Sequence, residues 1–172
     1  LGRLNTDKGI KELALAFGQL VKMHANVKLL LIGYDEGNMV EAIRDIIDQK
    51  ELVLFYGPTN IPEEILQAAD VFCLPSHREG FGTSVLEASL LGLPVICSDA
   101  YGLKETIIDG VTGLRHKVKD VNELYLAMLT LYKNDGQRRS MGLAGREYVL
   151  NNFRGAQITE EWLRFYADLF IN

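Results

Sequence analysis

The sequence contains few of the residues that build covalently linked or metal-held domains. It has two cysteines, Cys73 and Cys97, and three histidines among 172 residues, with none of the spacings typical of zinc ligands. Each cysteine lies within an apolar, strand-like run. We therefore expect two buried, reduced thiols in a cytoplasmic protein, and neither a disulfide framework nor a structural metal site.

The sequence also lacks a membrane span, a basic surface and a dinucleotide fingerprint. No apolar run approaches the roughly 20 residues that cross a bilayer. Lys and Arg number 18 against 23 Asp and Glu, and the resulting net charge of −5 argues against a nucleic-acid partner. No Gly-x-Gly-x-x-Gly follows the first complete apolar run, where a dinucleotide-binding domain would carry it. Any anion site must therefore be local and of another kind.

Apolar runs alternate regularly with helical segments along the chain. We predict strands over 27–33, 52–56, 71–74, 93–97 and 112–114, and helices over about 8–23, 38–50, 62–69, 83–91, 120–132, 137–151 and 157–170. Continuous apolar strands separated by helices are typical of a parallel sheet covered on both faces. We therefore expect one α/β, Rossmann-like domain over residues 1–172. The first four residues resemble the end of a strand, which suggests a fragment of a longer protein.

Residues 75–88 form the most informative stretch of the sequence. They follow a buried strand, turn at Gly80 and Gly82, and enter a helix. The free N–H groups and positive dipole at such a helix start favour an anion, most often a phosphate. Glu87 lies about two turns into the helix, too far to cap it, so its carboxylate either faces water or accepts hydrogen bonds from a ligand. The two glycines can equally be present for steric reasons alone, because a tight turn between a strand and a helix favours residues without a Cβ.

The order of these residues resembles a known motif. Glu-Gly-Phe-Gly-(x)4-Glu-Ala after Leu-Pro-Ser is similar to the donor-sugar motif of retaining GT-B glycosyltransferases of family four. Gly2-Arg3-Leu4 with Lys8-Gly9 resembles the segment whose Arg and Lys bind the donor diphosphate. The resemblance extends from residue 2 to residue 153 and covers only the C-terminal, donor-binding half of a two-domain GT-B fold. It implies an N-terminal acceptor-binding domain as a partner in the longer protein.

The resemblance implies roles for individual residues. Arg3 and Lys8 would offset the charge of the diphosphate, and Glu79 would position the donor sugar without acting as a displacing nucleophile; these three are the expected catalytic residues. Glu87 would accept hydrogen bonds from the ribose hydroxyls. The other expected donor contacts are Gly33, Tyr56, Gly57, Gly80, Phe81, Gly82, Thr83 and Ser84.

Several residues keep two interpretations. Tyr56 is either a base contact or a core aromatic residue. His77 is either a site residue or an ordinary surface or core histidine, and Glu105 is either a helix-start acid or a partner that orients a site loop. Asp35 and Glu36 are interpreted as acids at the start of a helix. The terminal helix over 157–170 packs either on this domain or on the absent half.

The implied function is a retaining, hexosyltransferase-type reaction. A sugar would move from a nucleotide-sugar, with a UDP-sugar favoured, to a glycan or lipid-linked acceptor in cell-surface polysaccharide biosynthesis. The sequence has no Asp-x-Asp triplet, which GT-A transferases use to hold a divalent ion, so we expect no metal and no other cofactor. We expect a cytoplasmic enzyme, peripheral at the inner face of the membrane, and an isolated chain that binds donor without transferring it. The alternatives are a sugar-nucleotide epimerase or another nucleotide-binding α/β domain.

Overall fold

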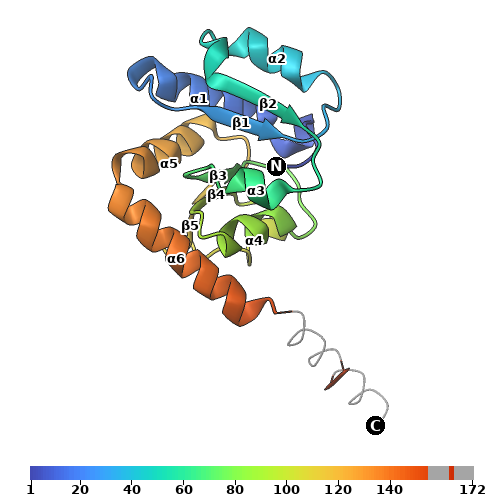
Figure 1. Ribbon diagram of the computed structural model, residues 1–172, viewed down its shortest axis with the longest axis vertical. Coiled ribbons are helices and arrows are strands. Elements are labelled where there is room, and N and C mark those ends of the chain that lie inside the picture. Colours follow the sequence, from blue (N-terminus) through green and yellow to red (C-terminus); the bar gives the residue numbers. More distant parts are fainter. Residues whose placement is uncertain (155–162, 165–172) are drawn as a thin grey trace.

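The computed structural model describes residues 1–154 and 163–164 of the chain (Figure 1). The strands are β1 (Leu29–Ile32), β2 (Val53–Gly57), β3 (Phe72–Leu74), β4 (Val95–Ser98) and β5 (Gly113–His116). The helices are α1 (Ile10–Met23), α2 (Met39–Ile46), α3 (Pro62–Leu66), α4 (Thr83–Leu90), α5 (Val121–Lys133) and α6 (Asp135–Asn152), with 3-10 turns η1 (Thr6–Lys8), η2 (Lys50–Leu52) and η3 (Tyr101–Leu103). The helix predicted over 157–170 lies outside the described residues, except for 163–164.

Every strand pairing is parallel, and helices cover both faces of the sheets, so the predicted α/β, Rossmann-like class is confirmed. Leu31 and Ile96 pack into a core with α1, α2 and α5, whereas Ile32, Val95 and Cys97 face a second core with α3 and α4. Side chains of neighbouring strand residues point to opposite faces, and both faces are buried. The sequence of each strand is therefore a continuous apolar run.

The strands form two sheets instead of the single sheet that we predicted. One has the order β1-β2 and the other β3-β4-β5. Between β1 and β3 lies a cavity of about 940 Å³, lined by both strands and by apolar side chains of α1 such as Leu13 and Phe17. Contacts between α1 and α5 join the two halves. Figure 1 shows β1 and β2 beside α1 and α2, apart from β3 and β4.

The first long helix begins later than its apolar pattern suggests. Gly9 adopts a left-handed conformation with φ of 66° and separates η1 from α1. The side chain of Asn5 accepts a hydrogen bond of 3.1 Å from the backbone N–H of Lys8 and so caps η1, not α1. The predicted start at residue 8 is therefore two residues early, and Lys8 belongs to η1 and not to α1. The helix predicted over 38–50 likewise ends at Ile46, and η2 follows it.

His116, at the end of β5, makes the stability of the fold depend on pH. Its side chain is 2% exposed, Nδ1 donates to the carbonyl of Lys117 at 2.8 Å, and Nε2 has no hydrogen-bond partner among the described residues. Burial lowers the pKa of His116, because the charged imidazolium loses its hydration. The stabilisation from the neutral ring is fully present above the ordinary pKa of about 6.5 and is lost as pH falls through the lower folded value.

We therefore expect His116→Gln to lose less stability than the wild type between pH 7.5 and pH 5. Urea unfolding at the two pH values measures the difference. Equal losses in both proteins would assign the pH dependence to other groups.

Candidate functional site

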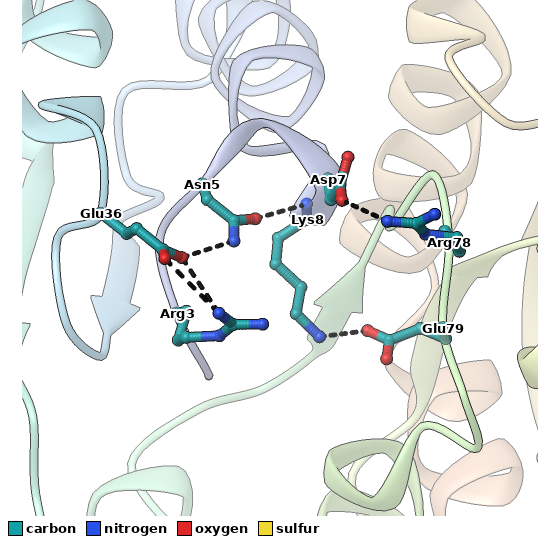
Figure 2. A network of polar contacts seen from close by, with 7 residues as sticks. All are labelled: Arg3, Asn5, Asp7, Lys8, Glu36, Arg78 and Glu79. Carbon is teal, nitrogen blue, oxygen red and sulfur yellow. Dashed lines mark hydrogen bonds and ion pairs between the residues drawn. The ribbon is translucent and has the colours of Figure 1, made fainter.

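A polar cleft forms where the N-terminal segment meets the loop after β3. It has a volume of about 380 Å³. The loops after β1 and β3 both bond to the N-terminal segment, through Tyr34 with Leu4 and His77 with Asp7. The cleft thus lies at the carboxyl ends of strands, where open α/β sheets bind ligands. The cleft is lined by Arg3, Asn5, Asp7, Lys8, Arg78, Glu79 and Gly80. Figure 2 shows the side chains of all of these except Gly80.

An ion pair between Lys8 and Glu79 lies at one side of this cleft. The two residues are 71 positions apart, yet Lys8 Nζ donates to Glu79 Oε1. The same oxygen accepts a hydrogen bond of 2.9 Å from the hydroxyl of Ser76, which is fully buried. The side chains of Lys8 and Glu79 are only 22% and 11% exposed, so both are oriented before any ligand arrives. Ser76 was not predicted, although its place after Leu-Pro belongs to the motif quoted above.

Backbone contacts hold the two loops of the cleft together. The backbone N–H of His77 donates to the carbonyl of Asp7 at 2.7 Å, and the Arg78 guanidinium lies 3.2 Å from the Asp7 carboxylate. Gly9 approaches so closely that a Cβ there would lie 2.1 Å from the carbonyl oxygen of Pro75. The position of Lys8 opposite Glu79 thus depends on a glycine at residue 9.

Arg3 faces the cleft from the other side. Arg3 Nη1 is 3.3 Å from Glu36 Oε2, and Asn5 Nδ2 donates to that oxygen at 2.8 Å. Asp35 acts as predicted, since its carboxylate accepts a hydrogen bond of 2.7 Å from the N–H of Met39 at the start of α2. Glu36 does not act as a helix-start acid, because its side chain crosses to Arg3 and Asn5.

Helix α4 begins beside the cleft without a side-chain cap. Its N-cap residue is Gly82, with φ of 64°, and no side chain accepts from the first turn, which contains Thr83 and Ser84. Glu87 lies on this helix and is exposed to solvent.

The remaining predicted donor contacts lie along the same edge. The N–H of Gly33 donates to the carbonyl of Gly57 at 2.8 Å, so the ends of β1 and β2 are adjacent. A Cβ on Gly33 would lie 1.7 Å from the carbonyl oxygen of Gly2, which explains a glycine there. Tyr56 is 53% exposed, so its interpretation as a core residue is wrong. The exposed ring of Phe81 meets Phe153 edge to face at 5.8 Å.

The two weaker candidates point elsewhere. The side chain of His77 is 13% exposed, and its Nε2 lies 3.0 Å from Glu12 Oε1 on α1, outside the cleft. Glu105 follows η3 and does not start a helix, so that interpretation is wrong. Its carbonyl accepts a hydrogen bond of 2.8 Å from the Tyr148 hydroxyl, and within residues 1–154 its exposed carboxylate has no hydrogen bond or ion pair.

This architecture, a parallel α/β domain with helices on both faces, is that of the Rossmann-like domains in GT-B glycosyltransferases. The chain belongs to the family described as "Glycosyl transferases group 1", whose sequence profile matches residues 1–148.

The chain is similar to curated members of this family over nearly its whole length. It is 33% identical over 168 residues to the capsular polysaccharide biosynthesis glycosyltransferase CapM of Staphylococcus aureus, covering 96% of this chain and 44% of that protein. It is 30% identical over 165 residues to N-acetyl-alpha-D-glucosaminyl L-malate synthase of Bacillus anthracis, covering 94% and 42%. The chain therefore spans less than half the length of these relatives.

Solved structures show the same fold. A single-residue mutant of S. aureus TarM, in complex with fondaparinux, alpha-GlcNAc-glycerol and UDP, superposes with a TM-score of 0.84 at 27% identity, over 95% of this chain and 34% of that chain.

None of the helices described here has both the length and the hydropathy to cross a bilayer.

Proposed function

We propose that this chain is the donor-binding domain of a retaining glycosyltransferase. The observation that carries the proposal is the convergence of Arg3, Lys8 and Glu79 on one cleft beside the uncapped start of α4. Two cations and a helix N-terminus together suit a diphosphate, and an adjacent carboxylate suits the hydroxyls of a sugar.

Each group has a separate task in this proposal. When the bond between the sugar and the diphosphate breaks, negative charge grows on the leaving oxygen. Arg3, Lys8 and the N–H groups of Thr83 and Ser84 stabilise that charge. The hydroxyl oxygen of the acceptor then bonds to the anomeric carbon on the face that the diphosphate leaves, and its proton passes to the departing phosphate oxygen. Glu79 holds the sugar hydroxyls throughout and forms no covalent bond.

The nucleoside lies further along the edge of the sheets. Glu87 accepts hydrogen bonds from the ribose hydroxyls, and the ends of β1 and β2 at Gly33 and Gly57 contact the base together with Tyr56. Gly80, Phe81 and Gly82 supply backbone beside the sugar. No step assigned to these residues requires a metal ion or another cofactor.

The donor and the pathway are proposed from the relatives. UDP is bound in the TarM complex, and CapM acts in capsular polysaccharide biosynthesis. We propose a UDP-sugar donor, a glycan or lipid-linked acceptor and a role in cell-surface polysaccharide biosynthesis. Because the acceptor pocket belongs to an N-terminal partner domain, the isolated chain binds donor but transfers sugar poorly. The full-length enzyme works in the cytoplasm, at the inner face of the membrane.

Calorimetric titration of the chain with UDP, GDP, ADP and their sugar conjugates tests the proposal. We expect saturable binding of the uridine series, and an affinity at least about tenfold lower in Glu87→Ala, because two charge-assisted hydrogen bonds are lost. Glu147→Ala, an exposed carboxylate on α6, is the matched control and should bind like the wild type. Unchanged affinity in Glu87→Ala would remove the ribose assignment.

A further inference from the structure

Glu36 contacts two residues that line the cleft, Arg3 and Asn5, although it was not itself assigned to the donor. It lies on the loop between β1 and α2, and its two carboxylate oxygens are 3.3 and 3.5 Å from Arg3 Nη1. Figure 2 shows its side chain turned toward Arg3 and Asn5. The loop does not need this carboxylate for its position, because the backbone N–H of Glu36 already donates to the carbonyl of Leu4 at 2.9 Å.

The charges around the cleft are balanced in pairs. Arg3 is paired with Glu36, Lys8 with Glu79, and Arg78 with Asp7. An anion that enters must therefore compete with carboxylates already in place.

The pairs are not equally easy to break. The side chains of Arg3 and Glu36 are 68% and 46% exposed, against 22% and 11% for Lys8 and Glu79. Exposed ion pairs contribute little to stability because water and salt screen them. Guanidinium groups also bind phosphate through two parallel hydrogen bonds. Arg3 can therefore exchange its partner at low cost, whereas Lys8 stays oriented by Glu79.

We propose that Glu36 is a positioning residue that holds Arg3 while the cleft is empty and releases it to an incoming diphosphate. The inference rests on the proposed function, because it takes the anion of this cleft to be a diphosphate. Glu36 then lowers the affinity of the cleft most for the anions that depend most on Arg3. Inorganic phosphate would draw Arg3 away from Glu36 less effectively than pyrophosphate.

Glu36→Gln tests the inference, because glutamine keeps an oxygen for Asn5 and removes only the charge. By calorimetry with inorganic pyrophosphate at low salt, we expect the affinity to rise about two- to fivefold, the range that an exposed charge pair supports. The ratio of pyrophosphate to phosphate affinity should rise, because phosphate depends less on Arg3, and the gain should shrink at high salt. Glu41→Gln is the matched control, since its carboxylate lies 3.9 Å from Arg44 on α2 and not in the cleft.

A double-mutant cycle with Arg3→Gln assigns the effect to this pair. The gain from Glu36→Gln should vanish when Arg3 is already glutamine. A gain that persists, or a Glu36→Gln affinity no higher than that of Glu41→Gln, overturns the inference, as does a failure of every variant to bind pyrophosphate. If pyrophosphate shows the expected gain but no nucleotide binds the wild type, the inference stands and the nucleotide-sugar proposal fails.

Discussion

Glu79→Gln should lower the rate of sugar transfer by the full-length enzyme about 10²- to 10³-fold, the usual effect of removing one preorganised electrostatic group from a reaction centre. Glu79 is held by Lys8 and by the buried hydroxyl of Ser76 before any donor binds. The substitution keeps the size of the side chain but removes the charge that fixes the sugar hydroxyls and orients Lys8.

Steady-state kinetics on the full-length enzyme measure this loss, and titrations of the chain locate its cause. Because Lys8 loses its carboxylate partner, the affinity for UDP alone should not fall. The extra affinity that the sugar gives a UDP-sugar over UDP should disappear. Glu147→Gln on α6 should change neither quantity. A loss of UDP affinity that matches the loss of UDP-sugar affinity would mean that Glu79 contacts the nucleotide, not the sugar.

Gly9→Ala should reduce the free energy of unfolding by about 3 kcal/mol, combining a left-handed backbone with overpacking. The new Cβ would lie 2.1 Å from the carbonyl oxygen of Pro75, and residue 9 has φ of 66°. Relief of this clash must separate the N-terminal segment from the loop after β3. Lys8 then moves away from Glu79, so donor affinity should fall together with stability.

Urea denaturation and calorimetry on the same samples check both parts. Gly18→Ala in α1 is the matched control, because an added Cβ there meets nothing within 4 Å. It should raise stability by roughly 0.5–1 kcal/mol, since alanine favours a helix interior over glycine. A Gly9→Ala protein as stable as the wild type would show that the two loops are not tightly joined.

The pattern of apolar residues along the sequence was sufficient to predict most of the fold. Strands buried on both faces leave continuous apolar runs, and these runs located β1 through β5. The start of α1 was misplaced because the sequence pattern does not distinguish the α-helix from the 3-10 turn before it, which Asn5 caps and Gly9 ends. The break between β1 and β3 was not predicted, because each apolar run on its own looks like part of a continuous sheet. Residues 2–4, which resemble the end of a strand, bond to the end of β1 and its following loop and line the cavity.

The candidate site was likewise predictable from the sequence only in part. The motif resemblance named Arg3, Lys8 and Glu79, and the structure places all three around one cleft. It could not name Glu36, because a pairing between side chains 33 positions apart depends on how the two loops meet in space. The local sequence favoured a helix-start role for Glu36, but in the structure its carboxylate contacts Arg3 and Asn5 instead.

The cavity between β1 and β3 leaves the two sheets joined by side-chain packing and by the N-terminal segment, because no strand ladder joins them in the part of the chain described here. Each core contains residues of both sheets, and residues 2–7 hydrogen-bond both to the end of β1 and to the loop after β3. An anion that bridges the cleft would strengthen this connection, so its binding should slow the exchange of backbone amide protons in both sheets.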